Sequence, residues 1–302
     1  MNNAKVKPIT KNPIKLNKNF TQISNANHNN SKSKIIEIKK QHFTIIELLV
    51  VMAIIILLAG LIFPSINRAK KQAITTSCLN NLTQINKASS LYLSDYEYYM
   101  PCFAADTGMS NNGKTWLGFR TKSGSDVKYE LKTGFISDYL KENTKVLFCP
   151  AFRKQDSDTE NSVTNGTGYG YNTCIGTWIY ITGSSYGSGA GLKVNQVTNP
   201  TNTVAFADAA NGRSTETQLK AIAFLYPMYS VKAPFYRTVF DSLNMHGDNV
   251  HFRHNASANV IWLDGHSSQE KASRLKAHDL ARRELIGNFG PEDNSLYDPW
   301  DL

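Results

Sequence analysis

The most informative absence in this sequence is that of charge between residues 43 and 63. In these 21 residues the only ionisable side chain is Glu47, and Ile, Leu and Val dominate the rest. A helix needs about 20 apolar residues to cross the hydrocarbon core of a bilayer. A secretory signal peptide has a shorter apolar core of about 7–15 residues before a small-residue cleavage site, and no such site follows here. The stretch therefore predicts a membrane-spanning helix.

Acidic residues are almost missing from residues 1–42. This segment holds nine lysines and one acid, Glu37, so it carries a net charge of +8 out of +9 for the whole chain. The remaining residues together carry only +1, which argues against a nucleic-acid partner. Lysines ahead of a span hold that end of the chain in the cytoplasm and send the C-terminal part across the membrane. We expect residues 1–42 to be a basic, disordered leader.

Cysteine is scarce, and no Cys-x-x-Cys motif occurs, which argues against a zinc knuckle or a redox motif of that kind. The four cysteines all follow the span, in a compartment where disulfides persist if it is oxidising. Four cysteines allow three pairings, and the sequence does not choose among them. The candidates for disulfide bonds are Cys78, Cys102, Cys149 and Cys174.

The sequence also lacks the H-E-x-x-H motif of zinc proteases. Several histidines and aspartates could in principle supply an acid–base pair. Histidines close to a β-hairpin are more often structural than catalytic, however. We therefore expect that the protein is not an enzyme.

The predicted helix continues beyond the membrane. Pro64 lies inside it and should kink it, because proline removes one backbone hydrogen bond. Polar residues then appear, and residues 64–98 predict an amphipathic continuation in which apolar or small residues recur at steps of three and four. The residues of this stripe are Ile74, Cys78, Leu82, Ile85, Ser89, Tyr92 and Leu93.

Residues 99–302 read as a globular head. The fold class that we predict is α+β, with the long N-terminal helix packed on a small antiparallel β-sheet. Alternation of apolar residues and the turn dipeptide Asp264-Gly265 mark the clearest β region. Further strands are expected at 146–150, 177–181, 202–208 and 267–271, a hairpin at 249–263 with a turn at 255–258, and short helices at 135–141, 214–223 and 273–284.

Residues 43–63 resemble the N-terminal segment of type IV prepilins and type II secretion pseudopilins. The chain reads Lys-Lys-Gln-His at 39–42 and Phe-Thr-Ile-Ile-Glu-Leu-Leu-Val-Val at 43–51, where the family has a basic leader and then Phe-Thr-Leu-Ile-Glu-Leu-Leu. The resemblance implies that a prepilin peptidase cuts between His42 and Phe43 and N-methylates Phe43. It also implies that Glu47 pairs with the amino terminus of a neighbouring subunit. The chain departs from the family at His42, where glycine is usual.

A second resemblance lies in the head. His254 is followed after nine residues by Asp264-Gly265, as in the H-X9-DG motif (254–265) of a class of prepilin-like proteins. Four further stretches echo that class, and together the resemblance covers residues 43–100 strongly and 146–270 in patches. These stretches are Cys78-Leu79-Asn80-Asn81-Leu82, Phe148-Cys149-Pro150, Tyr169-Gly170-Tyr171-Asn172 and Ala205-Phe206-Ala207-Asp208.

The role of this motif stays open at the level of sequence. Asp264 can start a turn by bonding its own backbone, and His254 can cap a strand end. Alternatively, Asp208, Asp264 and His266 could contribute to a metal site. Calcium is the metal that the pseudopilin resemblance suggests, and it prefers clustered oxygen ligands. We otherwise expect no cofactor.

The sequence as a whole predicts a structural, pseudopilin-like subunit of a type II secretion or type IV pilus-like filament. Its expected location is the inner membrane, with one span, a cytoplasmic N-terminus and a periplasmic or extracellular head. The expected partners are copies of itself or other pseudopilins, the prepilin peptidase and membrane lipid. The alternative is an envelope-anchored protein that binds carbohydrate or another envelope component, with an envelope hydrolase as a third reading.

Overall fold

The structure is a computed structural model. It describes residues 43–105, 112–123, 126–141, 143–152, 159, 161–176, 191–211, 220–225, 249–275, 285–291 and 295–297. The chain separates into two units, Met1–Ile55 and Ile56–Leu302. The N-terminal leader, the strand expected at 177–181 and most of the helix expected at 214–223 lie outside the described residues.

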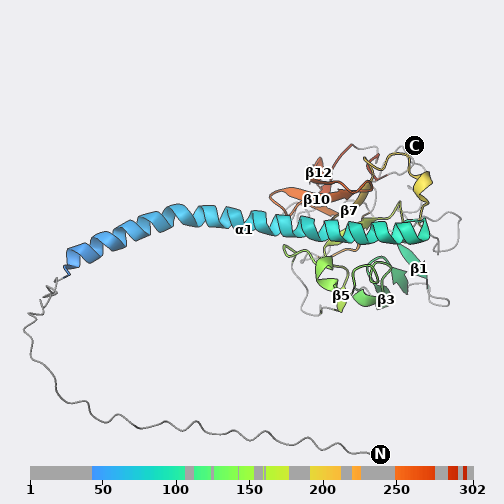
Figure 1. The fold of residues 1–302 in the computed structure, drawn as a ribbon, viewed down its shortest axis with the longest axis horizontal. Coiled ribbons are helices and arrows are strands. Elements are labelled where there is room, and N and C mark those ends of the chain that lie inside the picture. Colours follow the sequence, from blue (N-terminus) through green and yellow to red (C-terminus); the bar gives the residue numbers. More distant parts are fainter. Residues whose placement is uncertain are drawn as a thin grey trace, which may run out of the picture. The chain divides into compact units, whose positions relative to one another are not determined.

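The long helix predicted from the sequence is confirmed as α1, Ile45–Tyr96 (Figure 1). It begins with a capping box: the Glu47 N–H donates to Thr44 Oγ1, and the Thr44 N–H donates to Glu47 Oε2. Each side chain thus satisfies a backbone donor that the first helical turn leaves unpaired. The helix continues through Pro64. Its second half buries one face, and the buried residues are Thr75, Cys78, Leu82, Ile85, Asn86, Ala88, Ser89 and Tyr92.

The described strands form three sheets. Two have five strands, in the orders β1-β2-β3-β4-β5 and β11-β10-β7-β6-β8, and the third has the order β12-β13-β9. All neighbouring strands are antiparallel except β6 and β8. The strands are β1 (Phe103–Ala105), β2 (Gly113–Thr115), β3 (Phe119–Ser123), β4 (Asp126–Glu130), β5 (Ser162–Thr164), β6 (Tyr169–Asn172), β7 (Val204–Asp208), β8 (Phe224–Leu225), β9 (Val250–His251), β10 (Ser257–Trp262), β11 (Ser267–Lys271), β12 (Arg274–Leu275) and β13 (Ile286–Asn288).

The main core lies where the buried face of α1 meets both five-stranded sheets. Leu82 and Ile85 of α1 belong to one cluster with Trp116, which precedes β3, and Phe206 of β7. Figure 1 shows the second half of the helix crossing the head, with β7 and β10 on one side and β3 and β5 on the other. The predicted α+β class is therefore confirmed, because the described chain consists of one long α-helix and mainly antiparallel β-sheets.

Two of the expected strands are confirmed. Strand β7 ends in Asp208 as predicted, and β11 occupies the expected residues Ser267–Lys271. The strand expected at 146–150 is wrong, because Thr144–Leu147 form a short 3-10 helix that Pro150 soon follows. The helix expected at 135–141 is a series of turns. The segment expected as a helix at 273–284 begins with strand β12, and residues 276–284 lie outside the described residues. Further 3-10 helices lie at Leu131–Thr133 and Val194–Gln196.

The hairpin expected at 249–263 is also wrong. Strand β10 pairs with β7 and β11, whereas β9 pairs with β13. Only one rung joins the two segments, the pair of His254 with Ser257. Between them, Asn255 and Ala256 both have positive φ, 57° and 60°, so the turn has two residues and the primed geometry typical of tight hairpins. The sequence pattern identified the turn but not the strand partners.

Candidate functional site

The first of two regions that hold residues singled out by the sequence is the N-terminal end of α1. Large apolar side chains are exposed along this segment; Phe43 is 71% exposed and Ile45 78%. The helix contains an 18-residue window that is apolar enough to cross a membrane and is 0% buried. His42 lies outside the described residues. A soluble protein does not normally leave so large an apolar surface uncovered, so this segment needs lipid or protein around it.

Glu47 has a local role in the structure. Besides the backbone exchange of the capping box, its Oε2 atom accepts a hydrogen bond of 2.9 Å from Thr44 Oγ1. Glutamate at this position of a helix is favoured as a cap whatever else it does. Capping of α1 is therefore a second explanation for a glutamate at position 47, beside the pairing with a neighbouring subunit that the resemblance implies. A test must separate the capping role from the role of the charge.

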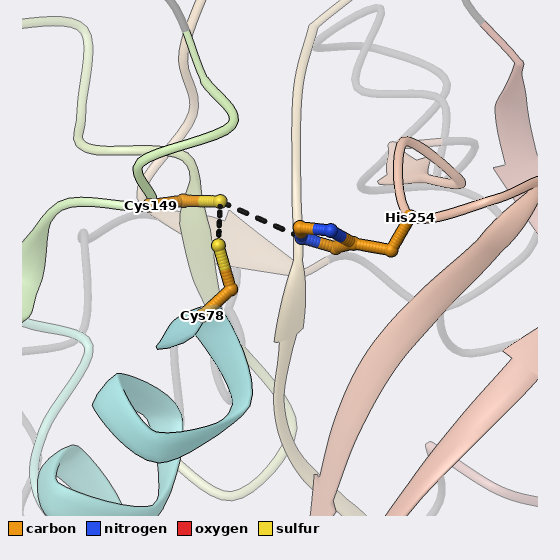
Figure 2. Close-up of side chains that lie close together, drawn as sticks. All are labelled: Cys78, Cys149 and His254. Atoms are coloured by element: carbon orange, nitrogen blue, oxygen red, sulfur yellow. Dashed lines mark hydrogen bonds between the residues drawn. The ribbon is translucent and has the colours of Figure 1, made fainter. Parts of the chain in front are cut away.

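The second region is a buried cluster of ionisable groups in the head. It gathers four segments: Cys78 on α1, Cys149 after the 3-10 helix, Asp208 at the end of β7, and Arg253 with His254 before β10. Figure 2 shows the two sulfur atoms facing each other, with the imidazole of His254 turned toward Cys149. All five side chains are nearly inaccessible to solvent; those of Asp208, His254 and Arg253 are 0%, 2% and 5% exposed.

Asp208 is the negative centre of this cluster. Its Oδ1 lies 2.7 Å from the Arg253 guanidinium, and its Oδ2 accepts a hydrogen bond of 2.8 Å from the Asn259 N–H. The same Oδ2 lies 3.4 Å from His254 Nε2. A carboxylate without solvent must be paired and hydrogen-bonded to remain charged, and Asp208 meets both conditions.

Arg253 and His254 are the two cations of the cluster, and their contacts keep them charged in spite of burial. Arg253 also donates to the carbonyl of Gly168, and its guanidinium lies 5.2 Å above the ring of Phe152. Burial alone would lower the pKa of Arg253, but Asp208 and Cys149 outweigh burial and raise it. Burial likewise lowers the pKa of His254, but its contacts with Asp208 and Cys149 raise it to about 9. Both side chains are therefore positively charged at neutral pH.

The two cysteines form the other side of the cluster. Their sulfur atoms are 2.6 Å apart, and Cys149 Sγ lies 3.3 Å from Arg253 Nε and 3.6 Å from His254 Nε2. Burial raises the pKa of the Cys149 thiol, but the Cys78 thiol and the two cations lower it well below its ordinary value. The contact with Cys149, followed by burial, raises the pKa of Cys78. Cys149 is thus the thiolate of the pair, and Cys78 keeps its proton.

Neighbouring polar side chains hold the cluster in place. Asn81 Nδ2 donates to the Phe148 carbonyl at 2.9 Å and fixes the segment that carries Cys149 to α1. The Tyr169 hydroxyl donates to the Cys78 carbonyl at 3.3 Å. Thr75 Oγ1 lies 3.3 Å from His254 Nδ1, so both nitrogen atoms of the imidazole face polar atoms. The stretches that carry the second resemblance thus converge on one buried site.

The three residues considered for an alternative metal site, Asp208, Asp264 and His266, do not lie together. Asp264 and His266 lie together at the turn between β10 and β11, and Asp208 lies at the other end of the β7–β10 ladder. Asp264 Oδ1 accepts from the His266 N–H at 3.1 Å and lies 2.6 Å from His266 Nδ1. Gly265 there has φ of 97°. Asp264-Gly265 is therefore a turn, as the structural interpretation of the motif predicts. The backbone of His254 pairs with Ser257 at the start of β10, and its side chain belongs to the buried cluster.

The other two cysteines are also buried but lie apart from this cluster. Cys102 Sγ points at the carbonyl oxygens of Asn172 and Thr173, at 3.8 and 3.9 Å. The Cys174 N–H donates to Asn172 Oδ1 at 3.0 Å. The described residues contain one set of side chains with metal-binding atoms close together, namely Cys78, Cys149 and His254. Sequence reasoning named each of these residues but not the set, because they come from three distant segments.

Two stretches of the head match the letters of enzyme motifs. Residues 108–115 match the P-loop pattern G-x-x-x-x-G-K-T, but Gly113–Thr115 form strand β2 between β1 and β3. A P-loop requires these residues to open a helix, so the match is fortuitous. Residues 183–187 match G-x-S-x-G and lie outside the described residues. Such a match counts only where a strand leads into it and a helix follows.

Comparison with known proteins identified no relative of this chain. No family model, no curated protein and no solved structure matches it. The structure by itself has a long apolar N-terminal helix followed by β-sheets, a layout compatible with that of pilins.

Proposed function

We propose that this chain is a membrane-anchored, pilin-like structural subunit that assembles through the N-terminal half of α1. The observation that carries the proposal is the uncovered apolar surface of that half, together with its single charge at Glu47. An apolar helix of this length is covered by lipid before assembly and by identical helices afterwards. The function is structural rather than catalytic.

The proposal includes the position of the chain in the cell envelope. The basic residues 1–42 stay in the cytoplasm, the helix spans the inner membrane, and the head lies on the far side. A prepilin peptidase removes residues 1–42 and methylates Phe43. The new amino terminus of one subunit then neutralises Glu47 of its neighbour, which makes an acid tolerable in an apolar filament core.

Intact mass spectrometry of the protein purified from its native membrane tests the processing step. The expected mass is that of residues 43–302 with one added methyl group. Retention of residues 1–42 would contradict processing at this site and leave the chain a tethered protein.

Substitutions at two positions test the assembly step, because they separate the charge of Glu47 from its capping role. Glu47→Gln keeps a side chain that can complete the capping box but removes the charge. Thr44→Ala removes the capping hydroxyl and keeps the carboxylate. We expect Glu47→Gln to abolish subunit–subunit crosslinking in native membranes and Thr44→Ala to leave most of it. Assembly of Glu47→Gln at the normal level would favour the alternative, an envelope-anchored binding protein that needs only lipid around α1.

A further inference from the structure

We propose that Cys78 and Cys149 form a disulfide bond that ties α1 to the segment after Thr144–Leu147 inside the head. In the structure the two residues are not bonded to each other, and their sulfur atoms lie 2.6 Å apart. This bond occurs in one of the three ways in which the four cysteines can pair. The inference rests on one part of the proposed function, namely that the head lies outside the cytoplasm, where disulfides persist.

The two sulfur atoms already face each other in a fixed position. Asn81 ties the Cys149 segment to α1, and Tyr169 is bonded to the carbonyl of Cys78 itself. A disulfide needs side chains that point at one another from backbones a few ångströms apart. Figure 2 shows the two side chains pointing at one another, Cys78 from a helix and Cys149 from a loop.

The geometry of the site argues against a metal centre built on the same residues. A tetrahedral metal with bonds of about 2.3 Å to each sulfur would hold the two sulfur atoms about 3.8 Å apart. The observed separation is 2.6 Å. The Arg253 guanidinium also stands 3.3 Å from Cys149 Sγ, where it would repel a metal cation. The nearest carboxylate, Asp208, is already bonded to Arg253 and to the backbone of Asn259.

The bond can close by thiol–disulfide exchange. A protein disulfide of the extracytoplasmic compartment is the oxidant. Before the head closes, the exposed Cys78 thiol loses its proton, and its thiolate displaces one thiolate from that disulfide and leaves a mixed disulfide on Cys78. As α1 docks, the Cys149 thiolate attacks the Cys78 sulfur and releases the second thiolate of the oxidant. Two cysteine thiols are oxidised and the oxidant's disulfide is reduced to two thiols, with the two cysteine protons passing to the released thiolates or to water.

The cations of the cluster favour this second step. Arg253 and His254 both lie against Cys149 and keep it in the nucleophilic form. Both sulfur-bearing residues are 2% exposed or less in the folded head. The oxidant must therefore act before the head has closed, and the completed bond is protected from later reduction.

The experiment is thiol trapping on the full chain. Native cells are treated with an alkylating agent before lysis, and the purified protein is digested and analysed by mass spectrometry. We expect a peptide pair joined through Cys78 and Cys149, lighter by two hydrogen atoms than the thiol forms. Alkylation of both residues, or their linkage to Cys102 or Cys174, would overturn the proposal.

Two controls distinguish this result from failure of the proposed function. Protease accessibility of the head in spheroplasts reports on which side of the membrane it lies, independently of its cysteines. If the head is outside and both thiols are alkylated, the disulfide is refuted while the location stands. Stoichiometric zinc retained by the purified chain, and lost in Cys149→Ser, would likewise refute it in favour of a metal centre.

The effect on stability provides a second measurement. Reduction of the wild-type protein in detergent should lower its unfolding midpoint by roughly 10 °C, because the bond closes a long loop. The matched variant Cys102→Ser, at another buried thiol, should keep this response. The variant Cys78→Ser should lose it. An equal response to reductant in both variants would contradict the pairing.

Discussion

The two halves of α1 differ in burial, and the difference is the opposite of what their hydropathy alone would predict. The first half is the most apolar part of the chain and is exposed, whereas the second half buries polar residues such as Thr75, Asn86 and Ser89. Burial in the second half depends on the partner that the head supplies. The first half has no such partner within the described chain. A single continuous helix can thus present one surface for its own fold and another for its surroundings.

The largest loss of stability is expected from removing the charge of Asp208, in the buried cluster of the head that the second half of α1 packs against. Asp208→Asn leaves the buried Arg253 guanidinium without its carboxylate and should lower the free energy of unfolding by about 3–5 kcal/mol. Denaturant unfolding of the full chain in detergent measures it. The matched variant Asp264→Asn, in the exposed turn, should change stability by less than about 0.5 kcal/mol. Similar losses in both variants would contradict the assignment of the buried cluster as structural.

The same substitution in the two halves tests the comparison directly. Leu82→Ala removes a side chain that is 0% exposed and should cost about 2–5 kcal/mol of head stability. Leu57→Ala, at a residue that is 65% exposed, should leave head stability within about 0.5 kcal/mol. Comparable destabilisation by Leu57→Ala would mean that the first half also packs on the head.

The pH dependence of His254 sharpens the account of the buried cluster. The groups that face its imidazole are Asp208, Cys149 and the hydroxyl of Thr75. In the reduced protein, without the disulfide bond, we expect the pKa of His254 to be about 9. In the disulfide form the thiolate is gone and the pKa should fall toward the ordinary value. NMR titration of the imidazole measures both, and equal values in the two forms would contradict the contact with Cys149.

The consequence for stability follows from the direction of this shift. A histidine whose pKa is raised by folding stabilises the fold fully below its unfolded pKa of about 6.5. In the disulfide form Cys149 does not titrate, so stability should fall as pH rises from about 6.5 toward the folded pKa of His254. The slope is at most about 1.4 kcal/mol per pH unit. His254→Asn should remove this slope, and its persistence would point to another group.

The smallest effect concerns the turn that positions His254. Ala256 has φ of 60°, a conformation that costs a residue with a side chain about 1 kcal/mol relative to glycine. Ala256→Gly should therefore stabilise the head by up to about 1 kcal/mol in denaturant unfolding. Gly at position 265, with φ of 97°, is the reverse case, and Gly265→Ala should destabilise. A loss of stability in Ala256→Gly would contradict the turn geometry.

Much of the local structure could be read from the sequence because it depends on neighbouring residues. The apolar run and the stripe from Ile74 to Leu93 predicted α1 and its buried face. The sequence predicted strands at 202–208 and 267–271, where β7 and β11 lie, and Asp264-Gly265 predicted the turn between β10 and β11. Prediction from short apolar stretches was less successful. Residues 146–150 have the composition of a strand but form a turn, because Pro150 and the contact of the Phe148 carbonyl with α1 determine the backbone conformation there.

The sequence by itself determined where the helix runs, which end of it suits a membrane, and which residues carry ionisable groups. Tertiary structure alone decided that Cys78 meets Cys149, 71 residues away, and that Thr75 meets His254, 179 residues away. Such contacts depend on strand order, and β10 joins β7 and β11 rather than its neighbour in the chain, β9. Local patterns report the preferences of a few adjacent residues, whereas burying a charged cluster requires several distant segments to pack at once.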